Sequence, residues 1–223
     1  MERISDSKKY KAILGVLLLG MLINTFLFSV KPNLSVDLKQ KYYAPIPMQE
    51  KFTFGYRMPM ADLLWLRTLQ DTSYCDNPIN KNVCHGNSWL FHMYDLITNL
   101  SPDFEQVYLI GGLVLSIVIS DIEGASKIFD KGTKQFPNNG FIAYQAAYHA
   151  LIEEEQPVKA ANLLLVVARV GGPPWTYSLA TRLLTDNGKK ELSERVLSEA
   201  IDRGVDQQFI DRMKKKLQGT PAN

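Results

Sequence analysis

Three prolines recur at nearly equal intervals and define a repeat in this chain. Pro102, Pro137 and Pro173 lie 35 and 36 residues apart. Each one follows a stretch of helical periodicity and precedes another, and proline is well tolerated in the first turn of a helix. Ala125 and Ala160 are also 35 residues apart. A period of this length predicts stacked helix pairs, which bury their apolar faces against their neighbours.

Helical periodicity extends over nearly the whole region after residue 57, and no alternating run long enough for a strand competes with it. We therefore predict an all-α fold. The stretch 104–119 is apolar nearly all round, so we expect both of its faces to be covered. The predicted helices are 60–72, 88–100, 104–119, 122–136, 141–154, 158–170 and 175–187, followed by apolar stripes over 192–201 and 209–217.

The residue types within the period resemble the tetratricopeptide repeat family, whose unit is a helix pair of about 34 residues. Small residues in that pattern let two helix axes approach, and an aromatic side chain fills the gap to the next pair. The stretch 106–137 matches well and 139–173 matches in part. The matching residues are Leu109, Gly112, Leu113, Ala125, Phe129, Gly132 and Pro137 in the first stretch, and Tyr144, Ala147, Tyr148, Ala160, Leu164 and Pro173 in the second.

The resemblance implies a short α-α solenoid over residues 58–217. Its first unit departs from the family pattern, because Leu90 stands where a small residue is expected and a long insertion separates the two helices. The implied units are 58–102, 103–137, 139–173 and 175–205, followed by a capping helix over 206–217 and a tail over 218–223.

An uncharged apolar segment, residues 12–30, precedes the repeats. As a helix it would reach roughly 28 Å, close to the ~30 Å hydrocarbon core of a bilayer. The segment ends Phe28-Ser29-Val30-Lys31, which has a bulky residue where a signal-peptide cleavage site needs a small one, so an uncleaved anchor is favoured over a removed signal peptide. The predicted order is a tail over 1–11, a transmembrane helix over 12–30 and a proline-interrupted tether over 31–57.

The charges beside this segment predict its orientation. Arg3, Lys8, Lys9 and Lys11 precede it, and the positive-inside rule places such an end in the cytoplasm. We expect a single-pass protein of a bacterial inner membrane, with its C-terminal domain in the periplasm. Asn24 lies within the segment, where it either contacts a partner helix or is tolerated without one.

Two cysteines bracket a turn-rich stretch. A disulfide between Cys75 and Cys84 would close a loop of about 10 residues and stabilise the fold by roughly 2.5–3 kcal/mol in the chain-entropy model. It requires an oxidising compartment, in agreement with an exported domain. Two alternatives stay open: a metal site that adds His85 and His92, whose spacing fits no common zinc pattern, or two unrelated buried thiols.

The sequence contains no G-x-S-x-G, P-loop or H-E-x-x-H signature. After residue 30 the charges balance, with 25 − 4 = 21 basic and 23 − 2 = 21 acidic residues. A neutral body argues against nucleic-acid binding, which needs a basic face. We therefore expect neither enzyme activity, nor a cofactor, metal or small-molecule substrate; an unrecognised active site around His85 or His149 is the alternative.

The resemblance also implies a groove, formed by the first helix of each pair, that binds a segment of a partner protein. We expect a membrane-anchored extracytoplasmic scaffold of a bacterial envelope assembly, similar to accessory repeat proteins of secretion, pilus or translocon machines. The alternative is a structural subunit of a large membrane complex, with its repeats buried by neighbours. Whether the groove is open or covered stays undecided. Its implied positions are Ile110, Val114, Ile117, Ile142, Gln145, His149 and Glu153.

Overall fold

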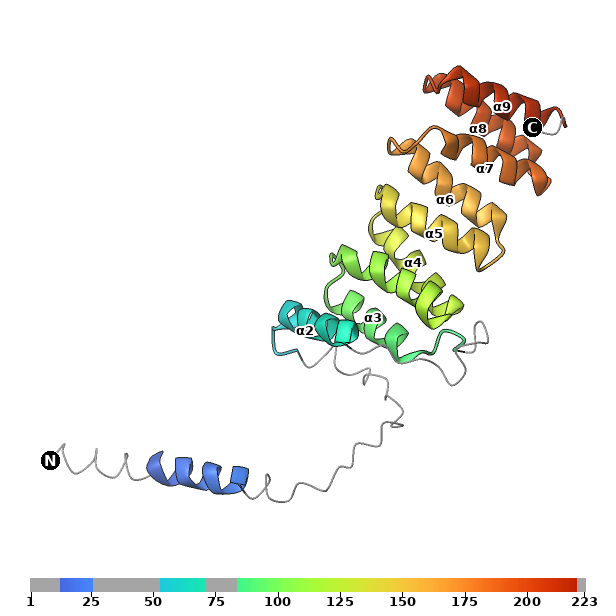
Figure 1. Cartoon of the computed structure of the whole chain (residues 1–223). Helices are drawn as coiled ribbons and strands as arrows, with labels where there is room; N and C mark the ends of the chain where they lie inside the picture. The colour runs from blue at the N-terminus through green and yellow to red at the C-terminus, as the bar shows by residue number, and fades with distance from the viewer. Residues whose placement is uncertain (1–12, 26–52, 71–83, 220–223) are drawn as a thin grey trace. The chain divides into compact units, whose positions relative to one another are not determined.

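The computed structural model describes residues 13–25, 53–70 and 84–219. The chain divides into two compact units, Met1–Lys41 and Tyr42–Asn223. All regular elements in the described residues are helices, so the predicted all-α class is confirmed (Figure 1). The predicted tail over 1–11 and most of the predicted tether over 31–57 lie outside the described residues.

The first unit contains a helix over residues 13–25, whose side chains are exposed. Within the three described ranges, no helix has both the length and the apolar character that a membrane crossing requires. The predicted transmembrane helix over 12–30 was therefore wrong.

The predicted inner-membrane location depended on that span and was also wrong. The same finding removes the basis for a cytoplasmic N-terminus, a periplasmic C-terminal domain and a membrane contact through Asn24. Asn24 is an exposed residue of the helix over 13–25. Residues 12 and 26–30, at the ends of the predicted span, lie outside the described residues.

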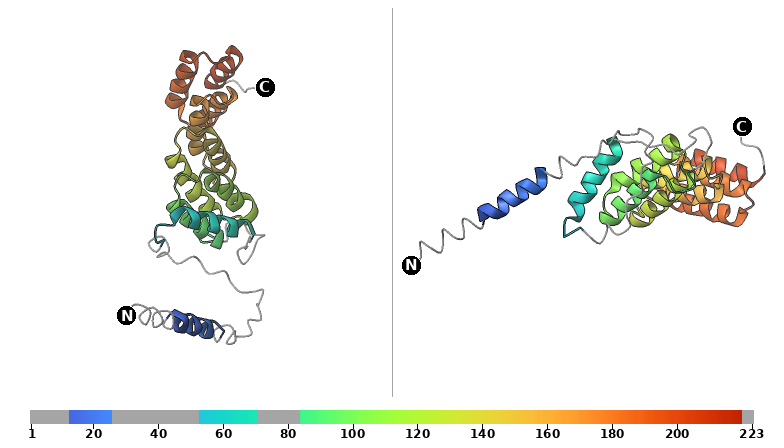
Figure 2. Two further views of the ribbon diagram at one scale, coloured as in Figure 1. Left: turned by 90° about the vertical axis from the view of Figure 1, so that its left-hand side faces the viewer. Right: turned by 90° about the horizontal axis from the view of Figure 1, so that it is seen from below.

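The second unit is a row of helices that follow one another in space in chain order (Figures 1 and 2). Each helix packs mainly on its sequence neighbours, while α5 also contacts η2 and α7 also contacts α9. The elements are α2 (Arg57–Gln70), α3 (Trp89–Leu100), η2 (Val107–Gly111), η3 (Val114–Ile119), α4 (Ile122–Gln135), α5 (Gly140–Ile152), α6 (Pro157–Arg169), α7 (Trp175–Asp186), α8 (Lys190–Asp202) and α9 (Gln207–Leu217).

Polar side chains fix where several of these helices begin. Asn139 accepts hydrogen bonds from the backbone N–H groups of Phe141 and Ile142, and so caps α5. Asp121 caps α4 through the N–H of Gly124 at 3.1 Å. The same buried carboxylate accepts the N–H of Gly86 at 2.7 Å, so it also ties the chain before α3 to the start of α4.

Glycines allow close contacts between η2 and α4. A Cβ atom on Gly112 would lie 2.5 Å from the ring of Phe129, and one on Gly132 would lie 2.8 Å from Cβ of Tyr108. Both distances are shorter than two non-bonded carbon atoms can approach, so larger residues at these positions would push the helices apart. Phe129 and Tyr108 are both buried in the apolar core.

The helical stretch over 105–119 contains η2 and η3, which are wider π-helical turns. We expected both of its faces to be covered, but Ile117 is 64% exposed. The prediction fails here because α4 packs against η2 and η3, whereas the next helix, α5, packs mainly against η2 and reaches η3 through the Ser116–His149 hydrogen bond. The outer side of η3 is therefore left to solvent.

We predict that Gly112→Ala lowers the free energy of unfolding by about 1–3 kcal/mol, because the added methyl group overlaps the Phe129 ring. Urea unfolding of the full chain measures the change. Gly20→Ala is the control, since a Cβ there meets no atom within 4 Å. In a double-mutant cycle, Phe129→Leu should offset part of the Gly112→Ala loss; two strictly additive losses would show that the ring is not the cause.

Candidate functional site

The residues implied for a groove do not form one surface. Ile110 and Ile117 are exposed and Val114 is half-buried. Gln145 and Glu153 are half-buried, whereas Ile142 and His149 are buried in the core. The implied positions on α5 therefore include both core and surface residues.

The exposed face of α5 lies one residue earlier than the implied positions. Phe141, Tyr144 and Tyr148 are exposed, and they precede Ile142, Gln145 and His149 by one position each. One residue turns a helix by about 100°, enough to move a side chain from one face to the next. The opposite face is buried through small residues that permit close packing: Ala143, Ala146, Ala147 and Ala150.

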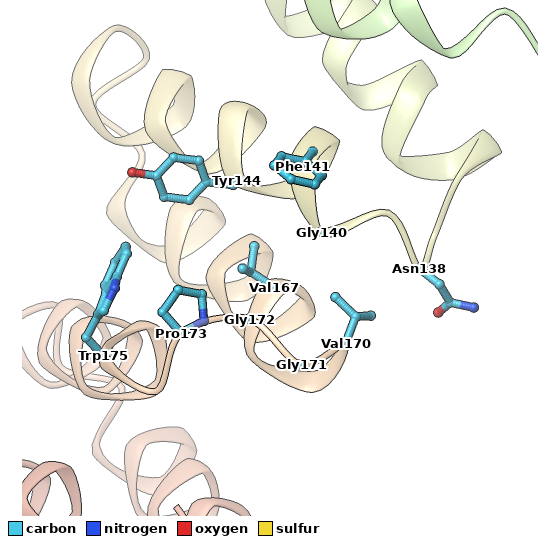
Figure 3. A pocket seen from close by; sticks show the side chains of 10 residues that line it. All are labelled: Asn138, Gly140, Phe141, Tyr144, Val167, Val170, Gly171, Gly172, Pro173 and Trp175. Carbon is cyan, nitrogen blue, oxygen red and sulfur yellow. The ribbon is translucent and has the colours of Figure 1, made fainter. Parts of the chain in front are cut away.

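The exposed aromatic residues border a groove of about 450 Å³ between α5 and the turn that joins α6 to α7 (Figure 3). Phe141 is 77% exposed, and Tyr144 and Trp175 are each 38% exposed. The rings of Tyr144 and Trp175 meet edge to face, with centroids 6.1 Å apart. The aromatic groove, as we call it, is lined by Asn138, Gly140, Phe141, Tyr144, Val167, Val170, Gly171, Gly172, Pro173 and Trp175.

Two glycines shape the turn that lines one side of the aromatic groove. Gly171 has a φ of +89°, in the left-handed region that favours glycine. A Cβ on Gly172 would lie 2.6 Å from the backbone oxygen of Val167, so this position also has no room for a side chain. The tight turn sets Pro173 and Trp175 across from α5, as Figure 3 shows.

The sequence reasoning assigned Tyr144, Tyr148 and Pro173 to repeat packing and missed Phe141 and Trp175. In the structure Tyr144 and Pro173 line the aromatic groove, and Tyr148 is exposed on α5 outside the lining. Two signals were present in the sequence. Phe141, Tyr144 and Tyr148 are aromatic residues at i, i+3 and i+7 spacing, and Trp175 follows Phe141 by 34 residues, about one repeat.

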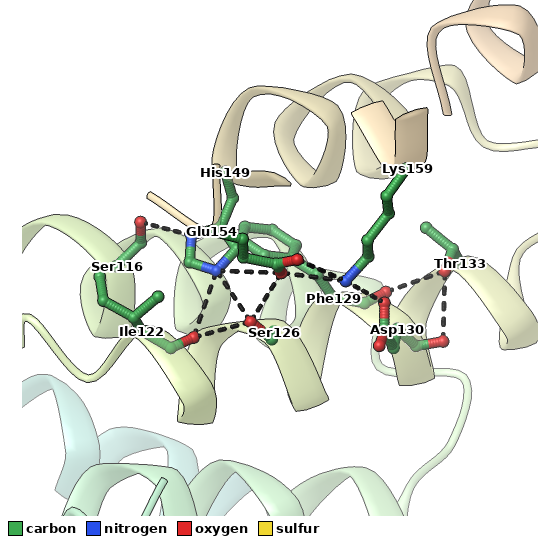
Figure 4. A network of polar contacts seen from close by, with 9 residues as sticks. All are labelled: Ser116, Ile122, Ser126, Phe129, Asp130, Thr133, His149, Glu154 and Lys159. Carbon is green, nitrogen blue, oxygen red and sulfur yellow. Dashed lines mark hydrogen bonds and ion pairs between the residues drawn. The ribbon is translucent and has the colours of Figure 1, made fainter. Parts of the chain in front are cut away.

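His149 lies in a buried polar network rather than in a groove (Figure 4). Its Nδ1 atom is 2.8 Å from Oγ of Ser116, and its Nε2 atom is 3.2 Å from the backbone oxygen of Ile122. Ser126 donates a hydrogen bond to Glu154 Oε1 at 2.6 Å. These contacts join the 105–119 stretch, α4, α5 and the turn after α5.

A lysine extends the network. Nζ of Lys159 lies 2.9 Å from Glu154 and 3.0 Å from Asp130. Burial lowers the pKa of Lys159, but its hydrogen bonds and attraction to Glu154 and Asp130 outweigh burial, so the pKa is raised above its ordinary value. The lysine therefore stays charged and links the start of α6 to α4.

The geometry favours a neutral His149 imidazole. Burial lowers its pKa, and Glu154 and the carbonyl of Ile122 only partly oppose that effect. A neutral ring that donates from Nε2 to Ile122 accepts at Nδ1 from the Ser116 hydroxyl. Serine, histidine and glutamate together are the components of a nucleophilic triad, but a side chain that is 2% exposed offers no approach to a substrate. The polar network around His149 links neighbouring helices to one another.

The residues around the cysteines lie apart from these features. Cys84 is buried, and Cys75 lies outside the described residues, so their disulfide stays a prediction. His85 contacts Glu123 at 3.3 Å, and His92 contacts Asn87 at 2.7 Å. Among the described residues, no three histidine, cysteine or acidic side chains gather in a way that could hold a metal ion.

Comparison of the chain with family models, with curated proteins and with solved structures gives no match.

We predict that the free energy of unfolding falls as pH drops below about 6.5, the ordinary histidine pKa. The unfolded chain binds a proton at His149 there, whereas the folded chain, with its lowered pKa, does not. The stabilisation that comes from the neutral, buried His149 is fully present above pH 6.5. It is lost as the pH falls from 6.5 to the lowered pKa of the folded state. Urea unfolding at a series of pH values measures it.

Other groups also titrate in this range, so the test compares variants. His149→Gln should reduce the pH dependence below that of the wild-type chain, because it removes the buried imidazole. An unchanged pH dependence in His149→Gln would contradict a neutral buried imidazole.

Proposed function

We propose that this chain is a scaffold built as a tetratricopeptide-like α-α solenoid, and that it binds a protein partner through the aromatic groove. The observation that carries the proposal is the exposure of Phe141, Tyr144 and Trp175 around one groove. Large aromatic residues dominate the energetics of protein interfaces, and a cluster of them on a surface is typical of a binding site.

The spacing of the helices supports the solenoid. The starts of α4 and α6 are 157 − 122 = 35 residues apart, and those of α5 and α7 are 175 − 140 = 35 residues apart. Helices pack mainly on their sequence neighbours, as expected where each pair contacts only the next. The contacts of Gly112 with Phe129 and of Gly132 with Tyr108 are the small-against-aromatic packing of the family pattern.

A second function is a structural subunit of a larger complex, and exposed leucines on α2 favour it. Leu63, Leu66 and Leu69 are each more than half exposed at one end of the row of helices. The terminal repeat of a solenoid normally has a polar outer face. A neighbouring subunit that covers these leucines would give the row a continuous core.

Photocrosslinking tests the scaffold proposal. We predict that a benzoylphenylalanine at position 141 in the full chain captures a discrete partner in native cells. The same group at position 194 on α8, where Glu194 is exposed, should not. Trp175→Ala should abolish capture from position 141, because it removes one wall of the aromatic groove.

Equal capture from positions 141 and 194, or capture that survives Trp175→Ala, would contradict the proposal. Thermal unfolding of the purified chain separates the two functions. A scaffold folds alone, whereas an obligate subunit gains most of its stability from its partners.

A further inference from the structure

We propose that the aromatic groove binds an uncharged, proline-rich segment of the partner in the extended polyproline II conformation. This inference rests on the proposed scaffold function and specifies the chemistry of its ligand.

The charge of the lining is the first argument. Each of the ten lining residues is uncharged, and Asn138 carries the single polar amide. A charged side chain buried against such a lining would lose its water without gaining an ionic partner, which is unfavourable. The segment that complements this groove in charge is therefore an uncharged one.

The charged residues next to the lining are already engaged within the chain. Arg169, which precedes Val170, forms a two-pronged pair with Glu199 at 2.8 and 2.7 Å. Glu105 accepts a hydrogen bond from the Asn139 side chain at 2.7 Å. The Arg169–Glu199 pair has no net charge, and the Glu105 carboxylate is held in place by the Asn139 amide.

The shape of the walls is the second argument. Phe141 and Tyr144 lie along α5 on one side, and Val170, Pro173 and Trp175 lie on the other, as Figure 3 shows. The planes of Tyr144 and Trp175 meet at 79°, so their rings form a corner. Proline rings dock against aromatic side chains in grooves of this kind, and polyproline II is already ordered before it binds.

Hydrogen-bonding capacity favours an extended segment over a helix as the ligand of the aromatic groove. In the part of the chain that the structure describes, neither the Trp175 indole N–H nor the Tyr144 hydroxyl forms a hydrogen bond. A polyproline II segment has no internal hydrogen bonds, so its carbonyl oxygens can accept from both groups. A helix uses its own carbonyls internally and would leave the Trp175 donor buried and unpaired.

Isothermal titration calorimetry of the full chain with an acetylated, amidated octaproline peptide tests the inference. The comparison peptide is an uncharged amphipathic helix of leucine, alanine and glutamine. We expect octaproline to bind and the helix peptide to bind more weakly. Trp175→Phe should weaken octaproline binding about fivefold through loss of one hydrogen bond. Phe141→Ala should weaken it about tenfold through loss of an aromatic wall.

Tyr148→Ala is the matched control, because Tyr148 is an exposed aromatic residue of α5 outside the lining. It should leave octaproline binding unchanged. Phe141 is mostly exposed, so its replacement should leave the fold intact, and circular dichroism checks each variant.

Tighter binding of the helix peptide, or no octaproline binding at millimolar concentration, would overturn the inference. Octaproline binding that Trp175→Phe and Phe141→Ala leave unchanged would overturn it too. The scaffold proposal is judged separately by capture from position 141. Capture without octaproline binding would leave a scaffold whose ligand has another chemistry, and loss of both would overturn both proposals.

Discussion

Close approach between η2 and α4 is the constraint on which the rest of the helix row depends. Gly112 and Gly132 bring the two elements together against Phe129 and Tyr108, and both aromatic side chains are buried there. This contact fixes the position of α4, and α5 then packs against both α4 and η2. The orientation of α5, and with it the aromatic groove, follows from a contact made one repeat earlier.

The buried face of α5 decides which residues reach the surface. Alanines and Ile142 face the core, and His149 is held by Ser116 and by the backbone of Ile122. With that face fixed, Phe141, Tyr144 and Tyr148 can only point outward. Their exposure is a consequence of the packing, and the glycine turn before Pro173 places Trp175 beside them.

Helix positions could be predicted from the sequence, whereas the site could not. The starts of α4, α6 and α7 fall within one residue of the predicted starts, because caps, prolines and apolar periodicity are local signals. Two of the groove positions implied on α5, Ile142 and His149, are buried, since alanine-rich and aromatic faces are both apolar and periodicity alone does not say which is buried. The His149 network was also hidden, because its members come from four separate segments.

The N-terminal prediction failed for a different reason. Composition indicated an apolar run over 12–30, but within the described residues no helix has the length and apolar character that a membrane crossing requires.

Quantitative co-purification from native cells tests the central claim, that the aromatic groove is a protein-binding site, most directly. The wild-type chain, Trp175→Ala and Tyr148→Ala would each be isolated under mild conditions, and the accompanying proteins quantified by mass spectrometry. We predict a partner that accompanies the wild type and Tyr148→Ala in constant ratio and is lost from Trp175→Ala. The same proteins in the same ratios with all three chains would contradict the account.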